Sequence, residues 1–227
     1  FTIRWGFESA GNLLYGISSL INSKKIDGSY TIGNIKFAQY LKTDFDFSYN
    51  KYIDRNNNVV YHIGLGYALP YGNADALPFE KRYIGGGANG NRGWNVRTLG
   101  PGIYKSSDDN IDYMNQSGDM QLNMNIEYRF KMFWLLEGAL FTDAGNIWTI
   151  NYYNTQDGGQ FKLNQFYKEI AASYGLGFRF DFTYFLIRVD MGIKAYNPSL
   201  ESYDRWRFKN LNWNDDMSLH FAVGYPF

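Results

Sequence analysis

Apolar and polar residues alternate along about eight stretches of roughly ten residues each, the length of a membrane-crossing strand. In residues 119–130 the apolar residues fall on even numbers and the polar residues, Glu127 among them, on odd numbers. Successive side chains of a strand point to opposite faces, so this period of two predicts strands with one apolar and one polar face. The predicted strands are residues 1–9, 37–52, 59–69, 119–130, 135–144, 170–182, 185–195 and 218–227.

The polar faces carry charges, and these charges indicate where each face points. In residues 37–52, Asp44 and Asp46 oppose a face that contains Phe45 and Phe47. Carboxylates in a dry core would be very costly, whereas carboxylates that face a water-filled lumen cost little. We therefore expect the apolar faces to point outward, toward lipid.

The connections between the predicted strands are alternately long and short. Outer-membrane barrels have this rhythm, with long outer loops and short periplasmic turns. The first long connection, residues 10–36, is interpreted as a loop with one helical turn. The pattern predicts an all-β fold, a transmembrane antiparallel β-barrel. A soluble lipocalin-like barrel is the alternative, but it predicts no such alternation and would turn the aromatic face inward.

Composition narrows the possible functions. The 22 Lys+Arg balance 22 Asp+Glu, so charge gives no case for a nucleic-acid partner. The 227 residues include no cysteine, which excludes disulfides, thiolate metal sites and a cysteine nucleophile. Aromatic residues make up 19% of the chain, and the mean hydropathy is −0.41. A membrane barrel has low hydropathy because only alternate residues face lipid, and the aromatic content favours this class.

The segment 79–102, FEKRYIGGGANGNRGWNVRTLGPG, separates two of the predicted strands. It is too rich in glycine for a helix and too long for an ordinary turn. Loops of this length in compact proteins are usually functional or disordered, and the spacing of its glycines and aromatic residues favours an ordered, functional loop. Arg92, Gly93 and Trp94 lie at its expected tip.

Several segments from Leu77 onward resemble the BamA/TamA superfamily of outer-membrane assembly and translocation proteins. The segment LPFEKRYIGGGANGNRGWNVRTLGPG resembles the family's long sixth outer loop, with its Arg-Gly-aromatic signature and following Leu-Gly-Pro. Asn91 replaces the usual Val or Ile of that signature, and Trp94 replaces Phe or Tyr. The other matching segments are LNMNIEYRF, LLEGALFTDAGNIW, YGLGFRFDF, LIRVDMGIKAYNP and LHFAVGYPF. Among its members, the chain most resembles the TamA-like, TamL-type proteins.

The resemblance implies a sixteen-stranded barrel preceded by periplasmic POTRA domains. Residues 1–227 would then form the second half of that barrel, because the chain starts directly with a strand and shows no export signal. The resemblance also implies that the signature loop folds into the lumen. Its arginine, Arg92, would meet Glu127 and Asp143 on neighbouring strands, and a guanidinium can pair with carboxylates in bidentate fashion.

The last predicted strand is a second candidate site. Leu219, Phe221, Val223, Tyr225 and Phe227 are expected to share one face and to end in a terminal aromatic residue. This resembles the β-signal by which outer-membrane proteins are recognised. In the family, the strand pairs weakly with the first strand and forms a lateral gate that templates client strands by β-augmentation. From these residues alone, the closing strand of a passive barrel is equally consistent.

The resemblance therefore implies a bacterial outer-membrane protein that inserts or translocates other outer-membrane proteins, without enzymatic activity, metal or cofactor. Its expected partners are outer-membrane lipids, client outer-membrane proteins and possible periplasmic or lipoprotein accessory subunits, but no nucleic acid. The alternatives are a barrel that anchors a patatin-like lipase encoded upstream, which a G-x-S-x-G motif there would indicate, and a passive porin.

Four other patterns have simpler interpretations. Residues 85–90 match GxGxxG, but no helix follows, so a nucleotide site is not expected. His62 and His220 are the two histidines, and we interpret both as ordinary polar residues of the lumen. Glu127 with Asp143 could form an acid–base pair, but the arginine explains both better. Asp108, Asp109 and Asp112 are interpreted as a solvated acidic loop, with a calcium site as the weaker alternative.

Overall fold

One eight-stranded antiparallel sheet dominates the computed structural model, which describes residues 1–26, 28–106, 114–182 and 184–227. The strands follow the order β1-β5-β6-β7-β8-β9-β10-β11, and a small sheet has the order β2-β3-β4. The strands are β1 Thr2–Ala10, β2 Lys25–Ile26, β3 Ser29–Ile32, β4 Ile35–Lys36, β5 Tyr40–Tyr52, β6 Asn57–Pro70, β7 Met120–Phe133, β8 Leu136–Trp148, β9 Ala171–Asp181, β10 Leu186–Tyr196 and β11 Met217–Val223. The helices are α1 Asn12–Leu20, η1 Phe79–Lys81, η2 Phe166–Lys168 and α2 Trp213–Asp216.

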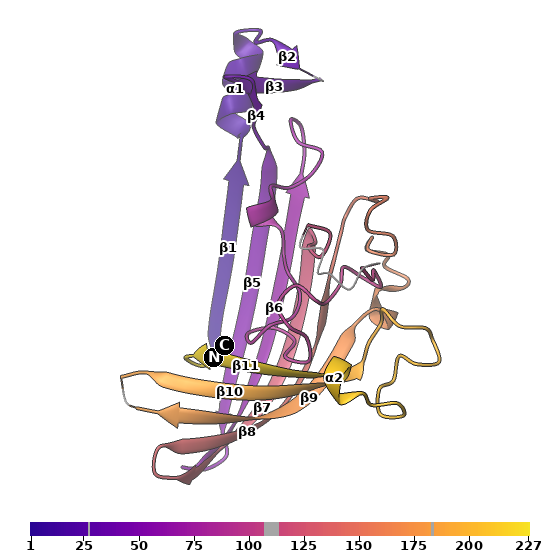
Figure 1. Cartoon of the computed structure of the whole chain (residues 1–227). Coiled ribbons are helices and arrows are strands. Elements are labelled where there is room, and N and C mark those ends of the chain that lie inside the picture. The colour runs from indigo at the N-terminus through magenta and orange to yellow at the C-terminus, as the bar shows by residue number, and fades with distance from the viewer. Residues whose placement is uncertain (27, 107–113, 183) are drawn as a thin grey trace.

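The large sheet is strongly curled, and its strand direction changes progressively from β1 to β11 (Figure 1). Consecutive strands of this sheet are neighbours, so every connection joins adjacent antiparallel strands. The long connections β1–β5, β6–β7, β8–β9 and β10–β11 lie at one end of the strands, and the short ones lie at the other. The predicted alternation of long and short connections is therefore confirmed. β1 and β11 form the two edges of the sheet.

The two faces of the sheet have the predicted orientation. Apolar side chains stand exposed on the convex face, as Phe45 and Ile126 do with 37% and 46% of their surface accessible. Charged side chains line the opposite, luminal face, where Glu127 and Asp143 are buried. An apolar outer surface of this kind is favourable against lipid.

The first long connection is more ordered than the sequence pattern suggests. Residues 12–20 form the nine-residue helix α1, followed by the small β2–β4 sheet. The prediction of a single helical turn was wrong because Leu13, Ile17 and Leu20 recur at helical spacing, although all three remain exposed. Within the described ranges, no helix is long and apolar enough to cross a membrane.

The buried apolar residues lie between the sheet and the loop that joins β6 to β7. Tyr40, Ala68 and Ile147 of the strands pack against Leu77 and Tyr83 of this loop. The loop is thus packed against the luminal face of the sheet, and the tip that carries the signature motif belongs to this packed region.

Candidate functional site

The luminal part of the β6–β7 loop is a folded hairpin-like segment. Gly87 N–H donates to the Trp94 carbonyl at 2.8 Å, and Arg97 N–H donates to the Gly85 carbonyl at 2.9 Å. Gly86 and Gly87 adopt φ of 80° and 93°, which L side chains rarely tolerate, so glycine permits the turn. This local structure holds residues 88–94 as a compact tip.

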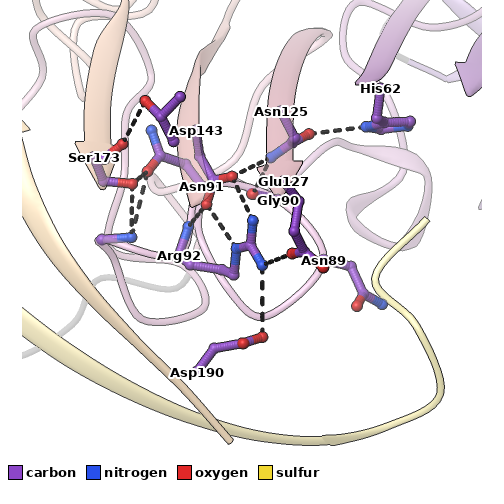
Figure 2. A network of polar contacts seen from close by, with 12 residues as sticks. His62, Asn89, Gly90, Asn91, Arg92, Asn125, Glu127, Asp143, Ser173 and Asp190 are labelled. Carbon is purple, nitrogen blue, oxygen red and sulfur yellow. Dashed lines mark hydrogen bonds and ion pairs between the residues drawn. The ribbon is translucent and has the colours of Figure 1, made fainter. Parts of the chain in front are cut away.

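Arg92 is fully buried at this tip and faces two carboxylates of the sheet (Figure 2). Its Nε and Nη2 donate to the two Asp143 oxygens, each at 2.8 Å, which is a bidentate pair. Its Nη1 donates to Glu127 Oε2 at 2.5 Å, and its backbone N–H donates to Asp143 Oδ2 at 3.0 Å. The structure thus brings together the arginine and both carboxylates that the sequence singled out.

The network is wider than these three residues. An oxygen of Asp190 on β10 lies 3.7 Å from Arg92 Nη1. The Asp190 carboxylate also forms ion pairs with Arg179 Nη1 at 2.9 Å and with Arg188 Nη1 at 2.8 Å. Glu127 also accepts from Arg129 and Arg179, at 2.6 and 2.9 Å. Four guanidinium groups therefore share three carboxylates across β7, β8, β9 and β10. The sequence placed the four additional residues on polar strand faces, which was the available signal, but it did not indicate that they meet.

The electrostatic balance keeps Arg92 charged. Arg92 belongs to the loop and not to a strand, and burial alone would lower the pKa of its guanidinium. The carboxylates of Asp143, Glu127 and Asp190 outweigh this effect, so the pKa of Arg92 is raised above its ordinary value. The centroid of the Phe141 ring lies 3.4 Å from the guanidinium carbon of Arg92, which adds a cation–π contact.

Glycines on both sides make room for the tip. A Cβ at Gly192 of β10 would lie 2.0 Å from the Arg92 carbonyl oxygen, and one at Gly93 would lie 2.5 Å from Ser173 Cβ. A Cβ at Gly177 of β9 would lie 2.0 Å from Asp190 Oδ1. Real side chains essentially never approach so closely, so these positions need glycine for the loop and the ion network to fit.

The two departures from the family signature both have structural partners. Asn91 is buried, its Nδ2 donates to the Ala171 carbonyl at 3.2 Å, and its Oδ1 accepts from Ser173 Oγ at 2.6 Å. Trp94 is 2% exposed and packs with Leu99 and Ala171. Asn91 is thus held by hydrogen bonds, and Trp94 provides a buried aromatic anchor.

Both histidines lie on the luminal side. His62 contacts Asp46 at 2.7 Å and Asn125 at 2.8 Å. Figure 2 shows the contact with Asn125, whose Nδ2 in turn donates to Asp143 Oδ1. His220 Nε2 lies 3.0 Å from the Arg92 carbonyl oxygen. Their contacts match the interpretation as polar residues of the lumen. Among the described residues, no group of three or more His, Asp or Glu side chains could hold a metal ion. Asp108, Asp109 and Asp112 lie outside the described residues.

The last strand is shorter than predicted. β11 ends at Val223, and its outward residues Leu219, Phe221 and Val223 are 52%, 72% and 75% exposed. The prediction that Tyr225 and Phe227 continue this face was wrong. Gly224 turns the chain with φ of 85°, and Pro226 has no N–H for a ladder.

The two terminal aromatic residues instead contact luminal groups. The Tyr225 hydroxyl donates to Glu137 Oε2 at 3.0 Å, and the Phe227 ring stacks on His62 with 4.7 Å between centroids. Tyr225 lies outside the strands, and burial followed by the nearby Glu137 charge raises its pKa to about 12.

The loop tip also touches β11 from the luminal side. Ser218 Oγ donates to the Gly93 carbonyl at 3.1 Å, beside the contact between His220 and Arg92. The opposite, free edge of β11 has no strand neighbour among the described residues. Gly224 N–H donates to the Leu186 carbonyl, so the N–H groups of the odd-numbered residues from 219 to 223 point toward this free edge.

Comparisons with known proteins agree with this architecture. The outer membrane protein assembly factor BamA of Neisseria meningitidis serogroup B is 32% identical over 95 residues, which cover 40% of this chain and 12% of that protein. The crystal structure of BamA from Haemophilus ducreyi lacking POTRA domains 1-3 superposes with a TM-score of 0.53 at 17% identity, over 83% of this chain and 35% of that one. CdiB from Acinetobacter baumannii gives a TM-score of 0.47 at 15% identity, over 82% of this chain and 27% of that one.

The chain thus spans about a third of the BamA structure and a smaller share of the BamA sequence. The model of the Omp85 superfamily domain matches residues 23–223, which is most of the chain. The predicted fold class and outer-membrane location are confirmed by these matches and by the orientation of the sheet. The protein belongs to the Omp85 superfamily, and its curled sheet is part of an outer-membrane β-barrel.

Proposed function

We propose that the protein inserts other outer-membrane proteins into the membrane or translocates them across it, through an opening beside β11. Membership of the Omp85 superfamily and the likeness to an outer membrane protein assembly factor support this class of function. Its clients would be outer-membrane proteins with a terminal β-strand, helped by periplasmic or lipoprotein subunits. The activity would require no enzymatic step and no cofactor.

The position of β11 at an edge of the sheet formed by the described residues is the observation that carries the proposal. The strand has seven residues and pairs only with β10 among the described residues, while its N–H groups at 219, 221 and 223 are available. An unpaired edge of this kind can accept an incoming strand by β-augmentation, and the exposed apolar face already suits lipid. A client strand would thus acquire both its hydrogen bonds and its membrane orientation at β11.

The Arg92 tip would act as an internal brace for this edge. It is held by Asp143 and Glu127 on the inner strands β8 and β7, and it reaches β11 through Ser218 and His220. These hydrogen bonds come from the luminal side and leave the edge groups of β11 free. The brace would keep β11 in place while its outer pairing partner is exchanged.

Site-specific photo-crosslinking in the full-length protein tests the proposal. A photoreactive amino acid at Leu219 on β11 is compared with one at Leu140 on β8, since the two positions are 52% and 53% exposed on the same outward face. We expect crosslinks to client precursors from position 219 and few from position 140. Equal crosslinking at both positions, or none at 219 during client assembly, would contradict an insertion site at β11.

A further inference from the structure

An apolar groove of about 400 Å³ lies on the outward wall, away from the lumen and from the β11 edge. Its floor is formed by Leu65 of β6 and Leu122 of β7, and Phe45 of β5 borders one side. Met120 and Trp148, which also line it, pair at the ends of β7 and β8 that meet the long loops. The groove therefore lies toward the outer leaflet, because long loops of such barrels are extracellular.

The other side of the groove is a wall of aromatic residues built by the β8–β9 loop. Phe161 and Phe166 stand edge-on to Trp148, with ring centroids 5.7 and 6.5 Å away. Trp148 Nε1 donates to Glu169 Oε2 at 2.7 Å, and Phe161 N–H donates to the Thr149 carbonyl at 2.9 Å. The loop is thus fixed against the outer face of the sheet, and the groove is preformed.

The chemistry of the lining selects an aliphatic occupant. Two polar side chains of the lining already have partners: Thr43 Oγ1 accepts from Trp5 Nε1, and Gln121 Nε2 donates to the Ile84 carbonyl. The rest of the lining consists of Gly66 and of aliphatic, aromatic or thioether side chains, with one hydroxyl on Tyr67. An occupant with many polar atoms would leave them without hydrogen bonds there.

A basic rim flanks the aromatic wall. Lys162 follows Phe161 directly, Lys168 follows the Phe166–Tyr167 pair, and both lysine side chains are exposed. Lysines at a membrane surface attract anionic headgroups, while the acyl part of the same lipid would lie below them. Together with the preformed groove, this favours a lipid over a peptide or a soluble ligand.

We propose that the groove binds one acyl chain of an anionic, phosphate-bearing lipid of the outer leaflet, with the phosphate held at Lys162 and Lys168. The site differs from ordinary lipid contact because residues of four strands and a fixed loop enclose it. It does not depend on the proposed insertion activity, since it requires only the outer-membrane orientation of the sheet.

Lipid retention by the full-length protein tests this site. The purified protein is incubated in detergent with lipid A or with phosphatidylcholine, and bound lipid is counted by native mass spectrometry. Leu65→Trp fills the groove, whereas Leu176→Trp adds the same volume to another outward position; the two leucines are 47% and 40% exposed. We expect at least a tenfold loss of retained lipid A for Leu65→Trp and little change for Leu176→Trp. Equal retention in both variants and the parent protein would overturn the site.

The headgroup contact is tested separately with Lys162→Glu and Lys168→Glu, and with Lys209→Glu on the β10–β11 loop as the control. These lysines are exposed, so the variants fold even if Leu65→Trp does not. We expect roughly fivefold weaker lipid A binding per rim lysine, with phosphatidylcholine unaffected. Unchanged lipid A binding, or a loss as large at Lys209, would overturn the assignment of an anionic lipid.

Discussion

At the scale of single residues, the buried ion network around Arg92 fixes the position of the loop tip. Removing charges from water costs several kcal/mol per ion, and the pairing among arginines and carboxylates offsets much of this cost without a large surplus. The network therefore adds little to stability compared with an apolar core, but it allows only one placement of the loop tip. Any residue that is removed alone leaves a buried charge without its partner.

A double-mutant cycle between Arg92 and Asp143 measures this property. Arg92→Ala and Asp143→Ala each leave a buried charge without its partner, so we expect each to destabilise the barrel by ~3–5 kcal/mol. The double variant should cost less than the sum of the two, by ~0.5–3 kcal/mol. Urea unfolding of the full-length protein, followed by its heat-modifiable band on gels, gives the values. Strict additivity would show that the pair is not coupled.

The close contact at Gly192 makes a second prediction. Gly192→Ala places a Cβ against the Arg92 carbonyl oxygen and should displace the loop tip, lowering the barrel's melting temperature. Gly6→Ala on β1 is the matched control, because its nearest neighbour would be Asp44 Cβ at an ordinary 3.7 Å. Thermal melts of both variants in detergent provide the comparison. Similar melting temperatures would mean that the tip can move without cost.

Sequence reasoning reached part of this network. Alternation put Glu127 on the luminal face, and the family resemblance connected it and Asp143 with Arg92. Alternation gives a face but not the register between distant strands, so it could not show that Arg179 and Asp190 meet across β9 and β10. The register between β9 and β10 is visible only in the structure, where Asp190 lies opposite Gly177.

At the scale of elements, the β6–β7 loop acts as an internal part of the barrel wall. Its apolar residues Leu77, Tyr83, Trp94 and Leu99 are buried, and its tip contacts β7, β8, β9 and β11. A loop with this much buried surface is expected to support the sheet, whereas the outer loops of a passive pore could be shortened freely.

Replacing residues 85–102 by a short Gly–Ser linker tests this role. The luminal carboxylates would lose Arg92 and the cluster around Trp94 would be emptied, so we expect loss of heat resistance and of assembly activity. Shortening the β10–β11 loop within residues 198–203 is the control. A linker variant with normal heat resistance would favour the passive-pore alternative.

Strand positions were more predictable than strand ends. Period-two alternation located all eight strands of the large sheet to within a few residues. It failed at β11, where apolar residues continue to Phe227 although Gly224 and Pro226 end the ladder. It also missed the extent of α1. The glycine and serine residues within and beside the apolar run that starts at Leu13 favour a loop over a helix.

At the scale of the whole chain, the curled sheet of the described residues combines a braced interior with an edge strand at β11. Luminal contacts fix the loop tip to the inner strands, the outer face suits lipid, and β11 keeps edge groups without strand partners among the described residues. We propose that these edge groups, rather than the apolar side chains beside them, receive client strands.

Client insertion by Phe221→Pro and Phe221→Ala tests this claim most directly. Both variants remove the same exposed aromatic ring, but only proline removes the N–H that points to the free edge, and β10 pairing is spared. The full-length proteins are placed in liposomes, and the folding rate of a urea-denatured client barrel is measured after heat modifiability confirms both folds. We predict that Phe221→Ala stays within about twofold of the parent rate and that Phe221→Pro falls about tenfold, the cost of one lost backbone hydrogen bond. A Phe221→Pro protein that inserts clients as fast as Phe221→Ala would contradict the account.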